Sequence, residues 1–500
     1  MRLLAVVTSR SGKRSRGGAA AGWGPRILAQ LYEVHVASSL ALLSAWLHHN
    51  PSEQMINALP DCMCHCMCAY VSSRVDGSAS ISYTSYISHT LLQSMGKLAF
   101  LLKAQVYAIL ACILYVLACL CLSHPILQRQ YLFLHNVRIP MFAKFDTPEL
   151  YGTEVGQVRN FRLESTDNIT LGAWHFLPEA FYNAKKQDLL SGESELLDDI
   201  YAEALREYPT FVFLHGNGLN RAASFRVRTC NDISKHMQAN VIAIDYRGYG
   251  DSDGYPTEQG VIDDAYAVVQ YAMRKGYNPE TDRQQGLSLV GQSLGTAIAT
   301  QCALRMYRER QHLDALVLLA AFKELRPMIT EFRMGGIVPM LKFLDYLPQK
   351  EQLLDNVFIY NFKTLDALAE IMNSTNDPGA IVPPVMILMH AMNDRVIDIY
   401  HSRDIFERML EITSATKLSS AYQIWSSSVP NLGYVNAIVS KTARAPERRG
   451  LIQGARFVLP RSASFSLVQL EKGGHDHLLN GNVDVLQLML PAYMMGNSAR

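Results

Sequence analysis

The sequence predicts an α/β protein in which helices cover both faces of a mostly parallel sheet, preceded by one membrane-spanning helix. Three observations support this. From about residue 130 onwards, short apolar runs alternate with helical patterns and Gly-rich turns, which is typical of parallel strands joined by helices. The string GQSLG at residues 291–295 stands between one such run and a helical segment. An apolar run without charges covers residues 104–122.

Composition narrows the class of protein. Of the 500 residues, 49% are hydrophobic and 18% are charged, which suits a chain with a sizeable core and excludes a wholly disordered one. The 46 Lys and Arg nearly balance the 45 Asp and Glu, so the charge does not indicate a nucleic-acid partner. Seven of the nine cysteines precede residue 122, which excludes a disulfide framework for the C-terminal part.

Residues 1–103 are predicted to be a basic, poorly structured tail, and residues 104–122 a transmembrane helix. The run has 19 residues, enough at about 1.5 Å per residue to cross a hydrocarbon layer of about 30 Å. It begins too far from Met1 for a signal peptide, so a buried core helix is the main alternative. The basic tail favours a cytoplasmic N-terminus, and hence a single-pass protein whose C-terminal domain lies across the membrane.

Two features of the tail leave alternatives open. Its basic start also fits a mitochondrial transit peptide. Cys62, Cys64, Cys66 and Cys68 alternate in CMCHCMC, which is compatible with S-acylation or a metal, although zinc sites usually take C-x2-C pairs. No role is assigned to these cysteines, and no metal or cofactor is predicted.

The C-terminal domain, residues 130–500, is predicted to contain six buried strands. Each is a short and nearly continuous apolar run, as expected of strands covered on both faces. Segments 257–275 and 296–308 have helical spacing. The predicted strands are 210–214, 241–245, 287–290, 315–319, 385–389 and 465–470.

The string LSLVGQSLGTAIAT, residues 287–300, predicts a nucleophile elbow at Ser293. The order strand, turn, helix puts this serine on a strained turn, where side chains two positions away on either side would collide with it. Gly291 and Gly295 remove those side chains. The alternative is an ordinary glycine turn.

A serine nucleophile in acyl transfer needs two backbone N–H donors for the oxyanion. Leu294, directly after the serine, would supply one. Strand 210–214 runs into HGNG at residues 215–218, and this loop would supply the second from Asn217. Alternatively, these glycines only permit a positive φ in a strand-to-helix loop.

The serine also needs a base that is oriented by an acid. Asp394 lies in the loop after strand 385–389, and His475 lies in a Gly-Gly turn after strand 465–470. The predicted triad is therefore Ser293, Asp394 and His475, in that order along the chain.

Each of the last two residues has a competitor. Asp398 lies further past the end of its strand than Asp394, and His477 lies closer to the closing helix than His475. Asp394 and His475 are therefore preferred.

The strings FLHGNG (213–218), DYRGYGDSDG (245–254), GQSLGTAIA (291–299) and HAMNDRVID (390–398) resemble the α/β-hydrolase domain family. The chain is most similar to its membrane-anchored lysophospholipid and monoacylglycerol lipases of the domain-containing protein 12 type. This resemblance implies the α/β-hydrolase fold and a serine hydrolase of the endoplasmic reticulum membrane with a lumenal catalytic domain.

The resemblance also implies a lid and points to an insertion. Residues 322–372 occupy the position of a lid, and the apolar stretch 332–347 is expected to be helical; a packed helix pair is the alternative. Asp394 and His475 are 81 residues apart, more than in the family, so residues 420–464 look inserted. In relatives the histidine follows an LGY-like string, whereas here that string leads to Asn436, so the base is expected from the later GGHDH turn.

The sequence thus predicts a membrane-bound serine hydrolase that cleaves acyl esters of single-chain lipids from the bilayer. A carboxylesterase or an acyl-protein thioesterase is the alternative among enzymes, because the fold and the triad do not define the acyl pocket. A catalytically inactive scaffold with the hydrolase fold is the alternative of another class.

Overall fold

The computed structural model describes most of the chain from Gly96 onwards. It divides into two units, residues 1–113 and residues 114–500. The described residues are 96–114, 117, 124–191, 194–278, 283–326, 333–334, 338–339, 349–373, 381–415, 422–426, 452–458 and 463–496. The rest of the predicted tail, including the cysteines of 62–68, lies outside them.

One apolar helix, Gly96–Leu114, is long and apolar enough to cross a membrane, and its side chains are not buried within the protein. It begins eight residues before the predicted span of 104–122. The helix includes Lys97 and Lys103 because its hydrogen bonds join backbone groups and do not depend on the side chains. Of the remaining predicted residues, 115–116 and 118–122 lie outside the described part. The helix is compatible with a single-pass membrane protein.

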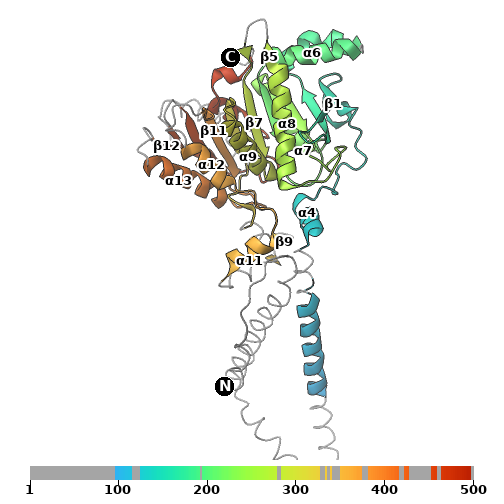
Figure 1. The fold of residues 1–500 in the computed structure, drawn as a ribbon, viewed down its shortest axis with the longest axis vertical. Coiled ribbons are helices and arrows are strands. Elements are labelled where there is room, and N and C mark those ends of the chain that lie inside the picture. The colour runs from blue at the N-terminus through green and yellow to red at the C-terminus, as the bar shows by residue number, and fades with distance from the viewer. Residues whose placement is uncertain are drawn as a thin grey trace, which may run out of the picture. The chain divides into compact units, whose positions relative to one another are not determined.

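A ten-stranded sheet forms the centre of the second unit (Figure 1). Its strand order is β1-β2-β4-β3-β7-β8-β11-β14-β13-β12. The strands from β4 to β14 are parallel, and antiparallel pairs complete both edges. The strands are β1 Val158–Glu164, β2 Thr170–Phe176, β3 Thr210–Leu214, β4 Asn240–Ile244, β7 Leu287–Gln292, β8 Ala315–Leu319, β11 Val385–Ala391, β12 Tyr422–Ser426, β13 Ile452–Val458 and β14 Ser464–Leu470.

The apolar runs form strands whose two faces are both buried within the protein. Every residue of β3, β4, β7, β8 and β11 is buried, whereas the edge strand β1 has a mixed pattern. All six predicted strands are confirmed, with ends that shift by at most two residues.

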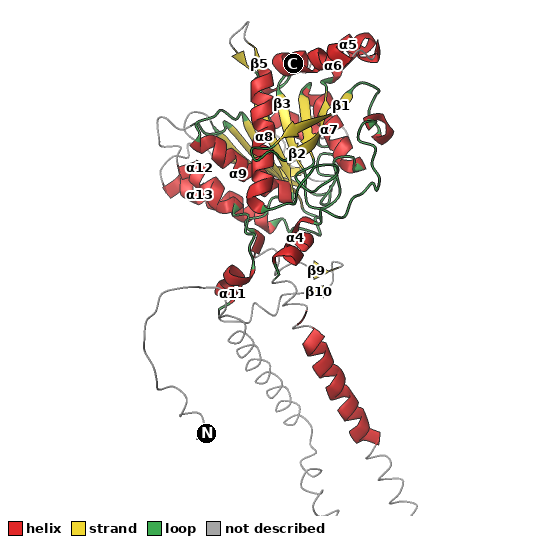
Figure 2. Ribbon diagram, turned by 45° about the vertical axis from the view of Figure 1, so that its right-hand side comes forward, coloured by secondary structure: helices red, strands yellow, loops and turns green. Residues whose placement is uncertain are grey.

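Helices cover the two faces of the sheet (Figure 2). One face packs against α7 Ser224–Met237 and α16 Val483–Met489. The other packs against four helices, two of them at the predicted positions. These are α8 Glu258–Gly276, α9 Leu294–Arg308, α12 Thr364–Asn373 and α13 Tyr400–Ala415. The predicted fold class is confirmed.

A pair of helices precedes β3, and a small β pair follows α8. Helices α5 Glu179–Ser191 and α6 Ser194–Glu207 enclose a separate apolar cluster that includes Phe181 and Tyr201. The β pair consists of β5 Tyr277–Asn278 and β6 Arg283–Gln284.

The predicted lid is described only in part. Helix α11 Lys350–Val357 is bound to α4 Pro125–Phe133, because Gln128 Nε2 donates to the Val357 carbonyl at 2.6 Å. The prediction of a helix over 332–347 is wrong for the residues described there. Arg333–Met334 (β9) pairs antiparallel with Val338–Pro339 (β10), and the intervening Gly-Gly and the proline disfavour a helix.

The region predicted as an insertion, 420–464, adds strands to one edge of the sheet. β13 pairs with β14, and β12 pairs with β13, both antiparallel. Because β14 still lies beside β11, the additional strands leave the central part of the sheet intact. Residues 427–451 lie outside the described part of the chain.

Candidate active site

Ser293 occupies a sharp turn between β7 and α9. Its backbone has φ 54° and ψ −120°, a region that residues other than glycine rarely adopt and that is associated with functional sites. The turn is held because the Ser293 N–H donates to the Leu319 carbonyl at 2.9 Å, and Thr296 Oγ1 donates to the Ser293 carbonyl at 2.7 Å.

The two glycines of this turn are required by close packing of the backbone. A Cβ atom on Gly295 would overlap the carbonyl oxygen of Leu214, and one on Gly291 would overlap the carbonyl of Gly295. Neither glycine has a positive φ. Both positions therefore require glycine on steric grounds. The atoms that a Cβ would overlap, however, are backbone atoms and not those of the serine side chain.

The structure brings the three predicted triad side chains into one hydrogen-bonded chain. His475 Nε2 lies 2.8 Å from Ser293 Oγ, and His475 Nδ1 lies 2.8 Å from Asp394 Oδ2. The three residues follow β7, β11 and β14. Since parallel strands end at the same edge of a sheet, residues 182 positions apart meet there.

Asp394 is held as a carboxylate. Its Oδ1 accepts the backbone N–H groups of Val396 at 2.8 Å and Ile397 at 3.1 Å. Burial of the carboxyl group raises its pKa, but hydrogen bonds from His390 and His475 outweigh burial, so the pKa of Asp394 lies below its usual value. An ionised acid at this position favours the proton on Nδ1 of His475, which leaves Nε2 free to accept the serine proton.

Neighbouring groups also fix the backbone around His475. Gly474 has φ 56°, and its N–H donates to Asn393 Oδ1 at 2.9 Å. Gln292 Nε2 donates to the His475 carbonyl at 3.3 Å. Sequence reasoning assigned no such role to Asn393 or Gln292, because these contacts join segments that are far apart in the sequence.

His390 is another residue that sequence reasoning missed. It is fully buried, with Nδ1 2.7 Å from Ser402 Oγ and Nε2 3.4 Å from Asp394 Oδ2. Its Nε2 also lies 3.0 Å from the Ile397 carbonyl, and the carboxylate oxygen that it approaches is the one that faces His475. Its position four residues before Asp394 was the only sequence signal.

The competing residues lie outside this hydrogen-bonded chain. Asp398 Oδ1 accepts the Tyr400 N–H at 2.9 Å, at the start of α13. His477 is exposed, and its Nδ1 pairs with Asn480 at 2.9 Å. The geometry therefore favours Asp394 and His475 over both competitors.

The predicted oxyanion donors flank the serine. Leu294 is the first residue of α9, so its N–H has no acceptor within the helix. The loop after β3 passes close by, since a Cβ on Gly216 would lie 3.1 Å from Ser293 Cβ. The Gly218 N–H donates to the carbonyl of Phe133, the last residue of α4, and the Leu219 N–H donates to the Val137 carbonyl just after that helix. Among the described residues, the Asn217 N–H donates to no other group.

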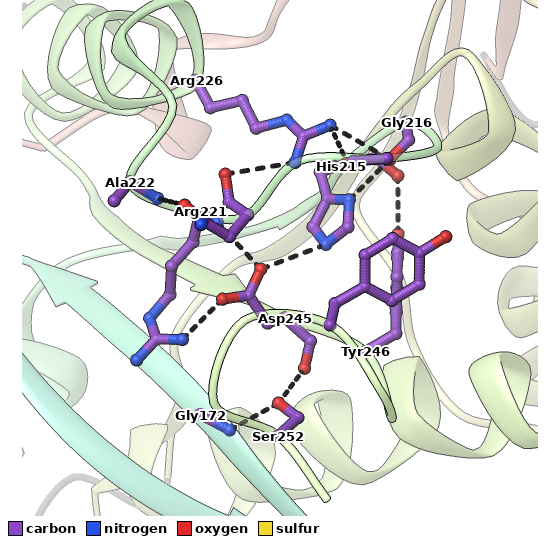
Figure 3. A network of polar contacts seen from close by, with 12 residues as sticks. Gly172, His215, Gly216, Arg221, Ala222, Arg226, Asp245, Tyr246 and Ser252 are labelled. Carbon is purple, nitrogen blue, oxygen red and sulfur yellow. Dashed lines mark hydrogen bonds and ion pairs between the residues drawn. The ribbon is translucent and has the colours of Figure 1, made fainter. Parts of the chain in front are cut away.

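A buried polar network lies behind this loop (Figure 3). Asp245 pairs with Arg221 at 2.6 Å and lies 3.5 Å from His215 Nε2. Burial raises the pKa of Asp245, but Arg221 and His215 outweigh it and lower the pKa overall. The Tyr246 hydroxyl donates to the His215 carbonyl at 3.0 Å. These contacts connect the segments that directly follow β3 and β4.

The fold and this site define a class, the proteins of the α/β-hydrolase fold. The family model described as alpha/beta hydrolase fold matches residues 209–368. Within the part of the chain that the structure describes, no group of three or more His, Cys, Asp or Glu could hold a metal ion.

Similar proteins of known name identify a family within this class. The lysophosphatidylserine lipase ABHD12 of Macaca fascicularis is 31% identical over 324 residues, covering 64% of this chain and 73% of that protein. The Xenopus tropicalis protein of the same name is 28% identical over 285 residues, and the match spans 56% of this chain and 65% of the relative's length. The chain therefore belongs to the ABHD12 family.

Similarity to solved structures is lower. An esterase of Pyrococcus furiosus is 19% identical, with a TM-score of 0.35 over 55% of this chain and 84% of that one.

Proposed function

We propose that this chain is a membrane-associated serine hydrolase that cleaves acyl esters of single-chain lipids. The single observation that carries the proposal is the hydrogen-bonded chain from Ser293 Oγ through His475 to Asp394, with 2.8 Å at both contacts. These distances are those that a nucleophile, its base and an orienting acid need.

In the proposed mechanism, Ser293 Oγ attacks the ester carbonyl carbon while His475 Nε2 takes the hydroxyl proton. Asp394 stabilises the imidazolium that forms and is not itself protonated. The N–H groups of Asn217 and Leu294 donate to the oxyanion of the tetrahedral intermediate.

Collapse of that intermediate breaks the bond to the alcohol, and His475 returns its proton to the leaving oxygen. Water then attacks the acyl-enzyme, with His475 again acting as the base. The products are a free fatty acid and the deacylated alcohol, and Ser293 regains its proton. The roles assigned to this chain's residues require no cofactor.

A lipid substrate is supported by the segment around and after α4. Its exposed apolar side chains include Phe142, which is 95% exposed, and Met141, which is 73% exposed. Residues 124–145 also contain Arg129, Arg138 and Lys144 and no Asp or Glu. An apolar surface flanked by cations suits contact with a bilayer that contains anionic lipids. Such contact would bring the loop at Asn217 close to the lipid.

The relatives carry the name lysophosphatidylserine lipase, and lysophospholipids are accordingly the first substrates to test; monoacylglycerols share the single acyl chain. The catalytic domain is proposed to lie on the lumenal side of the endoplasmic reticulum membrane, with residues 96–114 as part of its anchor.

The proposal is tested on the full-length protein in membranes. A fluorophosphonate probe should label the wild type, and Ser293→Ala should lose labelling and reduce ester hydrolysis by about 10³-fold or more. Activity is compared on lysophospholipids, monoacylglycerols, short carboxylic esters and acyl-thioesters. Preference for the last two would replace the lipid assignment with the esterase or thioesterase alternative. A wild type that neither labels nor hydrolyses any of these esters would be an inactive scaffold.

A further inference from the structure

Arg226 on α7 is a buried cation without a carboxylate partner. It is 2% exposed, and among the described residues no Asp or Glu forms an ion pair with it. The other buried arginines are paired: Arg221 with Asp245 at 2.6 Å, and Arg247 with Asp264 at 2.7 Å. Burying an unpaired charge destabilises a fold unless polar groups compensate it.

Carbonyl oxygens of the loop after β3 provide that compensation (Figure 3). Arg226 Nη2 donates to the carbonyls of Gly216 at 3.1 Å, Asn217 at 3.3 Å and Gly218 at 2.9 Å. Its Nη1 donates to the Asn220 carbonyl at 3.2 Å. One guanidinium group thus donates hydrogen bonds to four carbonyls of the loop that contains Asn217, the candidate oxyanion donor.

The contact to Gly216 also determines where one N–H points. The Gly216 carbonyl and the Asn217 N–H belong to the same planar trans peptide, so they point in opposite directions. His215 Nδ1 donates to this same carbonyl at 2.6 Å. With the carbonyl held by Arg226 and His215, the Asn217 N–H points to the other side of the loop. Ser293 packs closely against Gly216.

We propose that Arg226 is a positioning residue for acyl transfer, which orients the peptide between Gly216 and Asn217 so that its N–H stabilises the oxyanion. This inference rests on the proposed function. The cation acts in a second way through the same peptide. A carbonyl that accepts hydrogen bonds from a guanidinium is polarised, which makes the N–H of that peptide a stronger donor.

The test compares Arg226→Met, which removes both the charge and the donors, with Arg226→Lys, which keeps a charge but cannot span four carbonyls. Arg247→Met is the matched control, because Arg247 is also buried but bonds to Asp264 and Asp167 rather than to this loop. All variants are studied as full-length protein in nanodiscs. Titration with a fluorophosphonate counts the active sites, and p-nitrophenyl butyrate gives kcat and KM. The Ki of a trifluoromethyl ketone, which forms an oxyanion on Ser293, reports on oxyanion stabilisation.

Loss of an oxyanion donor lowers kcat by about 10²–10³-fold. We expect kcat per titrated site to fall by about 10²-fold in Arg226→Met with KM changed less than about 3-fold, and Ki to rise by a similar factor. Arg226→Lys should be intermediate, and it decides the question if the Met variant does not fold. Arg247→Met should lower the melting temperature while leaving kcat per site and Ki within about 3-fold.

Arg226 variants that lose thermal stability but keep kcat per site and Ki would overturn the proposal and leave Arg226 a structural residue. Equal losses of kcat in Arg226→Met and Arg247→Met would also overturn it. Failure of the proposed function is distinguished by the wild type, which would then neither react with the fluorophosphonate nor hydrolyse the ester.

Discussion

Asp394→Asn changes one oxygen of the acid to an amide nitrogen of nearly the same size. In the wild type, Oδ1 accepts two backbone N–H groups, and Oδ2 faces His475 and His390. The asparagine must keep its oxygen towards the backbone donors, so its NH2 group faces the two histidines.

This substitution changes the tautomer of the His475 ring. His475 Nδ1 must now accept a hydrogen bond from the amide, so the ring proton moves to Nε2, where it faces Ser293 Oγ. A protonated Nε2 cannot take the serine proton. The wrong tautomer in a triad of this geometry costs about 10⁴-fold in kcat, or about 5 kcal/mol in activation free energy.

The measurement is kcat and KM for a soluble ester in nanodiscs, together with the rate of fluorophosphonate labelling. We expect both kcat and the labelling rate to fall by about 10⁴-fold, with little change in KM because the carboxyl group does not face the substrate. Asp398→Asn is the control. Its oxygen can still accept the Tyr400 N–H, so activity should remain near that of the wild type.

A loss of less than about 10-fold in Asp394→Asn would refute the assignment of Asp394 as the orienting acid. A large loss in Asp398→Asn together with an active Asp394→Asn would transfer the role to Asp398.

Four further outcomes are expected. His475→Ala should lose activity as completely as removal of the nucleophile, while His477→Ala should retain most of it, measured as ester hydrolysis; the reverse result would reassign the base. Gly295→Ala should lower the free energy of unfolding by about 3 kcal/mol or more, because its Cβ would meet backbone atoms; unchanged thermal unfolding would contradict the packing argument. The lowered pKa of Asp394 stabilises the fold above about pH 4, the range of the unfolded carboxyl, so the stability difference between wild type and Asp394→Asn should shrink as the pH falls further. Asn168 is exposed and begins an N-x-T sequon, so a lumenal domain should lose a glycan in Asn168→Gln; a wild type insensitive to glycosidase, with its C-terminus open to protease in sealed microsomes, would reverse the topology.

Much of the fold could be predicted from local patterns in the sequence. The central strands are predictable because parallel strands buried on both faces must be apolar at nearly every position. The turn at Ser293 is predictable because the order strand, G-x-S-x-G, helix is a local pattern, although the carbonyl that excludes a side chain at Gly295 belongs to Leu214 on another strand. In contrast, 332–347 was expected to be a helix on its apolar character alone, which does not distinguish a helix from other buried structure.

The sequence by itself thus determined the class of sheet, the elbow and the order of the candidate triad, since each depends on neighbours along the chain. Only the tertiary structure decided that His475 Nδ1 meets Asp394 rather than Asp398, because residues 81 positions apart meet through the strand order. It also decided that Arg226 binds the carbonyls of its loop. A guanidinium on a helix carries no sequence signal of its partner, so the four carbonyls that accept hydrogen bonds from this one became apparent only in the structure.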